Sequence, residues 1–161
     1  MKANPAVYGI ARWTAAVLAV VFLFLLFGNN PVSNANLTDV EAAVTARIEM
    51  GNMLKGDNQM IKRFYGLYPA AFEECVLYYP TTNMQAEELL IIKLSDTAQA
   101  EGIKAAIEAR LETQKASFDG YGIEQYDMLT NNAVVEVRGN FVLFVVNAAS
   151  AQAREAFLGA L

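Results

Sequence analysis

All residues from Trp13 to Phe27 except Thr14 have apolar side chains, and the next charged residue after Arg12 is Asp39. A helix made of this run is apolar on every side, and about 20 such residues are needed to cross the hydrocarbon core of a bilayer. Lys2 and Arg12 both precede the run, so the positive-inside tendency keeps the N-terminus in the cytoplasm and exports the residues after the run. We therefore expect a transmembrane or signal-anchor helix here.

The sequence after this run first becomes polar and contains Pro31. Ser33 and Ala35 are small residues in positions that a signal peptidase accepts, so two outcomes remain open. The segment is either retained as an anchor or removed by cleavage after Ala35, which would release a secreted protein. The expected organisation is a cytoplasmic stub at 1–12, a transmembrane segment or signal-peptide core at 13–28, a polar spacer at 29–37 and an extracytoplasmic domain at 38–161.

Alternation and helical periodicity predict the elements of that domain. Thr38 and Glu41 have the spacing of a capping box, and Asp96 and Ser150 are further candidate helix caps. The run 89–94 is almost continuously apolar, which is typical of a central strand. The predicted elements are a helix from Thr38 towards Leu54, a short helix at 60–65, strands at 75–80 and 89–94, a long helix after Asp96 that ends before Ser117, a short helix at 123–129, strands at 133–138 and 141–146, and a terminal helix from Ser150.

Gly139-Asn140 separates the last two strands and has the length of a tight hairpin connection. The other two strands precede the long helix, so helices and strands do not alternate as they do in a parallel sheet. The order of elements predicts a single α+β domain, with a mostly antiparallel four-stranded sheet and helices packed on a face of it.

Composition narrows the chemistry. The protein of 161 residues has a net charge of −5, and the part after Arg12 is more acidic still, which disfavours nucleic acid as a partner. It has no histidine, which is the usual nitrogen ligand of zinc sites and the usual general base of serine triads, so both kinds of site are disfavoured. Its one cysteine, Cys75, cannot form an internal disulfide and lies too far from the apolar run to carry a lipid. We expect Cys75 to be a small buried side chain, and we expect no metal, cofactor or catalytic residue.

A few polar side chains are candidates for a site. Arg110 and Gln114 are one helical turn apart beside the apolar stripe, where a guanidinium fork can meet a ligand carboxylate or a backbone. Glu88 and Lys93 bracket the central strand, and Tyr121 follows the long helix. Two interpretations remain open: these residues line a polar cleft, or Arg110 pairs with a carboxylate such as Glu88 and ties helix to sheet.

Several of these segments together resemble a known family. The segment Glu87–Lys93, then Arg110 and Gln114 with Phe118 and Tyr121, and then Gly139–Val146, are similar to the bacterial domain of unknown function family 4358. The resemblance implies export and one compact domain, and it implies no catalytic residue. Many members are lipoproteins, and this protein differs from them because it lacks the lipidated cysteine.

The expected function is that of a non-enzymatic module on the outer side of a bacterial cytoplasmic membrane. It would bind an envelope protein, or a second copy of itself, for assembly of the cell envelope. The alternative is a sensor or carrier domain that binds a small ligand in a cleft near Arg110.

Overall fold

The computed structural model describes residues 13–19, 22 and 32–161. The chain divides into two units, Met1–Pro31 and the compact domain Val32–Leu161. Residues 13–19 are helical, with Trp13 and Leu18 exposed. Among the described residues, no helix has the length and hydropathy needed to span a bilayer. The expected stub at 1–12 and half of the expected membrane segment, 20–21 and 23–28, lie outside the described residues.

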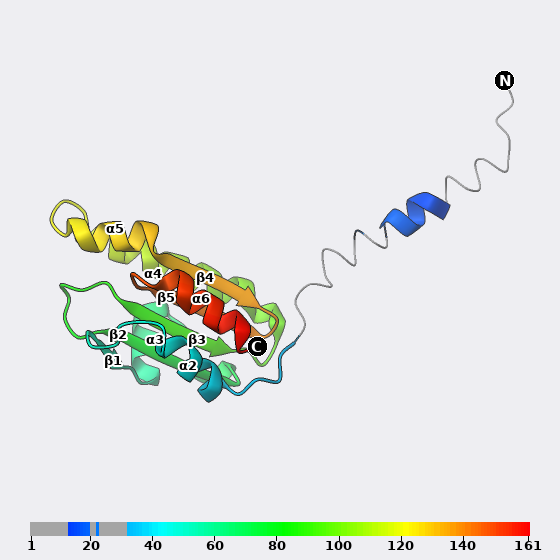
Figure 1. Ribbon diagram of the computed structural model, residues 1–161, viewed down its shortest axis with the longest axis horizontal. Helices are drawn as coiled ribbons and strands as arrows, with labels where there is room; N and C mark the ends of the chain where they lie inside the picture. The colour runs from blue at the N-terminus through cyan, green and yellow to red at the C-terminus, as the bar shows by residue number, and fades with distance from the viewer. Residues whose placement is uncertain (1–12, 20–21, 23–31) are drawn as a thin grey trace, which may run out of the picture. The chain divides into compact units, whose positions relative to one another are not determined.

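A five-stranded, fully antiparallel sheet forms the middle of the domain, in the order β1-β2-β3-β5-β4 (Figure 1). The prediction of four strands was one short, because the edge strand β1 is only three residues long and carries no recognisable alternation. The other four strands were predicted within one residue at each end. Their bounds are β1 Met53–Lys55, β2 Glu74–Pro80, β3 Glu88–Lys93, β4 Ala133–Arg138 and β5 Phe141–Val146.

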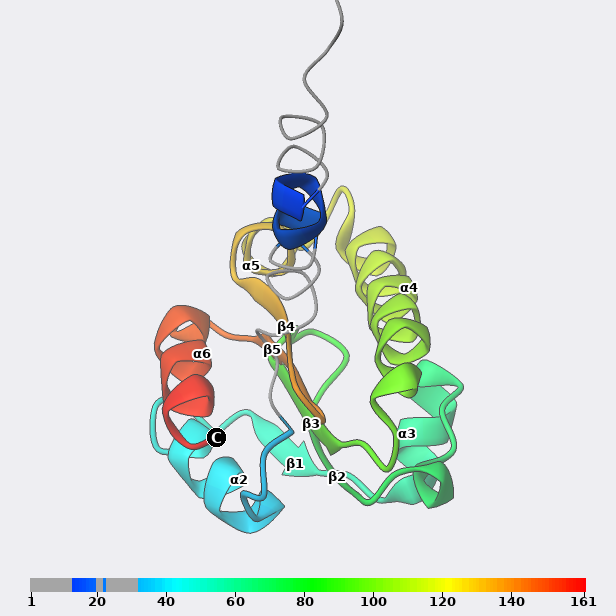
Figure 2. The same ribbon diagram turned by 90° about the vertical axis from the view of Figure 1, so that its right-hand side faces the viewer.

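Helices cover both faces of this sheet, as the end-on view shows (Figure 2). On one face lie α2 and α6, and on the other lie α3 and α4, with α5 beside α4. The expectation of helices packed on a face was therefore incomplete. The central strands β3 and β5 are buried on both faces, which explains why their sequences are continuously apolar. The helices are α2 Leu37–Thr45, α3 Asn58–Tyr65, α4 Ala100–Phe118, α5 Ile123–Asn131 and α6 Ser150–Gly159.

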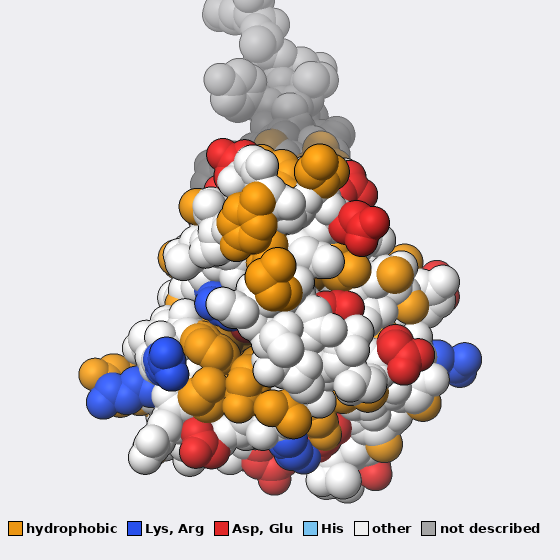
Figure 3. Space-filling view, turned by 90° about the vertical axis from the view of Figure 1, so that its left-hand side faces the viewer, with side chains coloured by type: hydrophobic (Ala, Val, Ile, Leu, Met, Phe, Trp, Pro, Cys, Tyr) orange, Lys and Arg blue, Asp and Glu red, His pale blue; other side chains and the backbone are white. Residues whose placement is uncertain are grey.

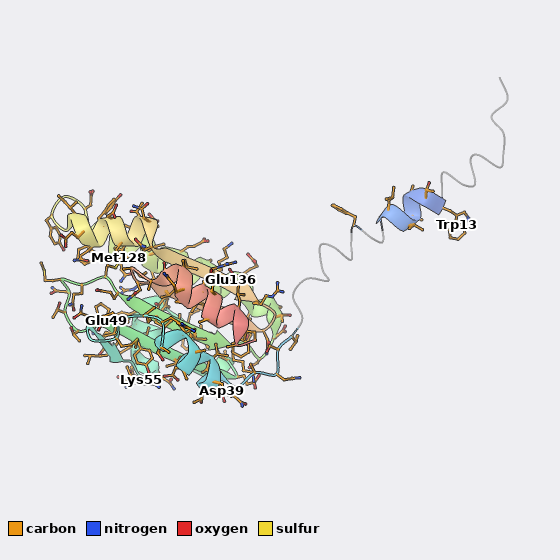
Figure 4. All side chains as sticks on the ribbon, viewed as in Figure 1. Trp13, Asp39, Glu49, Lys55, Met128 and Glu136 are labelled. Atoms are coloured by element: carbon orange, nitrogen blue, oxygen red, sulfur yellow. The ribbon has the colours of Figure 1, made fainter. Side chains whose placement is uncertain are left out.

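The first helix of the domain is shorter than predicted. Its N-cap is Asn36, and the expected capping box from Thr38 is wrong, because Glu41 accepts hydrogen bonds elsewhere. Glu41 Oε1 lies 2.6 Å from Tyr78 Oη and 2.6 Å from Lys55 Nζ, so it links α2 to β2 and to β1. Lys55 is labelled in Figure 4. The helix ends at Thr45, since the backbone must turn back to place β1 beside β2.

The remaining helix boundaries follow local chemistry. Asp96 and Gln99 form a capping box at a short 3-10 turn that leads into α4, as the sequence indicated for Asp96. The predicted cap at Ser150 is wrong: Ser150 is the first residue of α6, and Asn147 instead accepts from the backbone of Ala149 at 3.0 Å. Ala153 and Phe157 face the core, as expected.

The compact domain begins before the first helix. Ser33 N–H donates to Asn140 Oδ1 at 2.8 Å, and Ser33 Oγ donates to the backbone oxygen of Leu161 at 2.9 Å. Ala35 packs against the core cluster under α2 and α6. Much of the segment expected as a spacer is thus attached to the domain.

Candidate functional site

A buried carboxylate stands at the start of β3. Glu88 is fully inaccessible to solvent, and its two oxygens accept four hydrogen bonds. Tyr65 Oη and Arg110 Nε (3.3 Å) donate to Oε1, while Arg110 Nη2 and Gln114 Nε2 (both 2.8 Å) donate to Oε2. A carboxylate offers about four lone-pair positions, so Glu88 is saturated. The network joins α3, β3 and α4, and it confirms that Arg110 pairs with Glu88.

The guanidinium of Arg110 is held in one orientation. Its Nε–Nη2 edge meets Glu88, and its Cζ lies over the ring of Phe64, 4.3 Å from the ring centroid. A guanidinium has a second edge, formed by Nη1 and Nη2, which can also hold two acceptor atoms. No acceptor among the described residues occupies that second edge. Arg110 retains 16% side-chain exposure.

The tyrosine in the network is fixed as a neutral donor. Burial is the main reason that the pKa of Tyr65 is raised well above its usual 10.0, and the adjacent Glu88 charge adds to it. Its phenol therefore keeps its proton at physiological pH and donates to Glu88.

Gln114 is 94% buried, and its amide orientation is set by Glu88, because a carboxylate can accept but not donate. Its Nε2 faces Glu88, and its Oε1 has no hydrogen-bond partner among the described residues.

A pocket of about 310 Å³ opens beside Arg110 and Gln114. Aromatic rings form much of its wall, and hydroxyl and amide side chains from the β2–β3 loop form its rim. Its lining residues are Phe64, Tyr79, Pro80, Thr81, Thr82, Asn83, Gln85, Arg110, Gln114, Ser117 and Phe118.

Two predicted site residues do not join this cluster. Lys93 lies at the opposite end of β3 from Glu88, about 16 Å away at roughly 3.3 Å per residue. It pairs with Glu73 at 2.8 Å instead. Tyr121 is 60% exposed and rests against Phe118, with ring centroids 6.0 Å apart. The structure therefore brings together Glu88, Arg110 and Gln114 only.

The sequence did not place the two aromatic residues of α3 that complete the cluster, Phe64 and Tyr65, beside Glu88; Tyr65 was considered only among the tyrosines of a possible aromatic platform. Both follow Lys62 and Arg63 in a short amphipathic helix, so their only signal was an apolar spacing that any packed helix would show.

Apolar side chains are exposed around the same end of the domain (Figure 3). A second depression, of about 270 Å³, lies between the end of α4 and α5 and shares Phe118 with the first. The exposed side chains are those of Met84 in the β2–β3 loop and of Tyr121, Ile123 and Tyr126 after α4.

Other candidate chemistry is weaker. Cys75 is half-buried, and burial raises the pKa of its thiol, which disfavours the reactive thiolate. In the part of the sequence that the structure describes, no group of three or more acidic or cysteine side chains is arranged to hold a metal ion.

A protein-family model matches much of the chain. The model described as "Domain of unknown function (DUF4358)" matches residues 46–147, which is more than half of the sequence. The matched region contains all five strands, α3, α4 and α5, and therefore the whole network around Glu88. Comparisons with curated proteins and with solved structures gave no match.

Proposed function

Because the chain belongs to the DUF4358 family, whose function is unknown, we propose a function from the protein's own residues. The protein is a non-catalytic binding module, tethered to the outer side of a bacterial cytoplasmic membrane, that binds an envelope protein. The partner binds at the end of the domain formed by the β2–β3 loop and the α4–α5 connection. We call this region the loop-end surface; its exposed apolar members are Met84, Tyr121, Ile123 and Tyr126.

One observation carries this proposal: several large apolar side chains lie in solvent at one end of an acidic domain. Tyr121 is 60% and Ile123 81% exposed, and Met84 is 60% exposed on the facing loop. Single exposed apolar residues are ordinary, whereas a cluster beside a pocket is typical of an interaction surface. Tyrosine and methionine are also enriched at protein interfaces.

The network around Glu88 supports a non-catalytic role. A general base needs a free lone pair that a substrate proton can reach, and Glu88 has neither a free lone pair nor solvent access. Arg110 and Gln114 are held by the same carboxylate. The cluster is thus built to present fixed groups to the pocket rather than to transfer protons.

The membrane tether rests on the apolar run and on the two cations that precede it. Retention of that run is favoured over cleavage after Ala35, because cleavage would remove Ser33. The domain would then lose the two hydrogen bonds that Ser33 makes to Asn140 and Leu161.

Site-specific photo-crosslinking in intact cells tests the binding surface. A photoreactive amino acid at Tyr121 or Tyr126 should give the same discrete adduct, and the matched control is Gln152, an exposed position on α6, across the sheet. An adduct of twice the protein's mass would identify the partner as a second copy. Equal adducts at Gln152 and at the two tyrosines, or none at any position, would refute the loop-end surface.

A small-ligand module is the second candidate, favoured by the pocket beside Arg110. Its volume of about 310 Å³ is near the lower limit of ligand pockets, which span about 300–1,000 Å³. A ligand bound there would raise the unfolding temperature further with the logarithm of its concentration above the Kd, with no adduct at Tyr121 or Tyr126.

A further inference from the structure

We infer that the pocket beside Arg110 holds the backbone C=O and N–H of one residue in an extended, uncharged segment of the partner, with that residue's apolar side chain in the pocket. This inference rests on the proposed function and specifies what the loop-end surface recognises. It assigns Arg110 as the donor and Gln114 as the acceptor.

The donor is the free edge of the Arg110 guanidinium. Glu88 occupies only the Nε–Nη2 edge, and its two hydrogen bonds to that edge fix the guanidinium, whose Cζ lies over the ring of Phe64. The Nη1–Nη2 edge consequently points away from Glu88, on a residue that lines the pocket and keeps 16% side-chain exposure. Its N–H groups need an acceptor, and water or a carbonyl oxygen can supply one.

The acceptor is Gln114 Oε1. This oxygen is buried and has no partner among the described residues, although Gln114 lines the same pocket. An unsatisfied buried acceptor is unfavourable, so a donor that enters the pocket gains from satisfying it. Arg110 and Gln114 are one turn apart on α4 and both donate to Glu88 Oε2, so their side chains are neighbours.

The charge balance selects an uncharged ligand over a carboxylate. Glu88 already neutralises Arg110, and a second carboxylate on the same guanidinium would leave the cluster with a net negative charge. The whole protein carries a net charge of −5, so its long-range field also repels anions. A backbone carbonyl offers the same acceptor geometry without this repulsion.

The rest of the pocket fits a peptide. Phe64, Tyr79 and Phe118 supply an apolar wall for one side chain. Exposed apolar residues continue beyond the pocket on both loops, and a longer peptide can cover them whereas a metabolite of pocket size cannot. In an extended strand the C=O and N–H of one residue point to the same side, which matches adjacent donor and acceptor groups.

The test uses N-acetylphenylalanine amide as the probe and N-acetylphenylalanine, its carboxylate counterpart, as the comparison. Binding to the ¹⁵N-labelled full-length protein in detergent is followed by amide chemical shifts of the pocket residues. Ser117→Phe places a ring at the mouth of the pocket. Thr113→Phe is its matched control, because both positions are exposed on α4, and each hydroxyl donates to the backbone oxygen four residues earlier at 2.9 Å.

We expect saturable shifts with the amide, binding of the carboxylate about tenfold weaker, and loss of about tenfold in affinity in Ser117→Phe but not in Thr113→Phe. Equal or tighter binding of the carboxylate overturns the inference, as does the absence of saturable shifts with the amide. Equal affinity of the two variants overturns it as well. The adducts at Tyr121 and Tyr126 are measured separately, so a protein-binding surface without this pocket recognition would be recognised as such.

Discussion

Arg110→Met is the substitution that most directly tests the buried network. Methionine preserves much of the apolar stem of the side chain, but it removes both hydrogen bonds to Glu88 and the stack on Phe64. Glu88 then keeps only Tyr65 and Gln114 as donors and remains fully buried with an uncompensated charge.

The expected cost follows from that burial. Breaking a buried ion pair by removing one partner costs about 3–5 kcal/mol, and the two surviving donors favour the lower end, about 3 kcal/mol. With a urea m-value of about 2 kcal/mol/M, the unfolding midpoint should fall by roughly 1.5 M. In a Glu88→Gln background, Arg110→Met should cost at least about 1 kcal/mol less, because no buried charge is left unpaired.

The assay is urea unfolding of the Val32–Leu161 domain at neutral pH, followed by circular dichroism. Arg154→Met is the matched control, since Arg154 also joins a helix to a glutamate on a strand, Glu136, at 2.6 Å. Glu136 is labelled in Figure 4. That pair is 45% and 19% exposed, so it should contribute no more than about 1 kcal/mol. Equal costs for Arg110→Met and Arg154→Met, or an unchanged cost of Arg110→Met in the Glu88→Gln background, would refute the reasoning.

Three further substitutions test the network and the glycines of α4 and of the connection after it. Tyr65→Phe should cost about 1.5–3 kcal/mol at pH 8, because it removes a hydrogen bond to a charged group. The raised pKa of Tyr65 gives stability that is complete below the unfolded value of 10.0 and is lost as the pH rises towards the folded value, so urea midpoints should fall more above pH 10 in the parent than in Tyr65→Phe. Gly102→Ala should raise stability by about 0.5–1 kcal/mol, since a helical Cβ there meets nothing within 4 Å. Gly122→Ala should lower it by about 1–3 kcal/mol, because its Cβ would lie 2.5 Å from Phe118 Cδ1; thermal unfolding of both variants checks the contrast in sign.

Local patterns were sufficient for most of the fold. The hairpin at Gly139-Asn140 was predicted because tight turns favour particular residues. The strand β3 was predicted because a strand buried on both faces has a continuously apolar sequence. The edge strand β1 and the early end of α2 were not, since both depend on a distant segment. Met53–Lys55 is a strand only because β2 lies beside it. Glu41 accepts hydrogen bonds from Lys55 and Tyr78 instead of forming the expected helix cap.

The site was predictable to the same extent. Helical spacing predicted that Arg110 and Gln114 share a face of the long helix. Glu88 is a charged residue at the start of an apolar strand, so its contact with Arg110 and Gln114 could be inferred from the sequence. The separation of Lys93 from Glu88 follows from strand length alone and could have been recognised. Phe64 and Tyr65 could not, because their place beside Glu88 is set by how α3 packs across the sheet.

The bond from Ser33 to Leu161 has a practical meaning for engineering, because it places the two ends of the compact domain within hydrogen-bonding distance. A few residues of linker would join these ends, and the exposed loop at 81–84 offers a new opening away from the core clusters. Such a circular permutant would keep every strand pairing of the sheet and would move the termini to the rim of the pocket. A fluorescent reporter attached to either new terminus would then respond to a ligand that binds in the pocket.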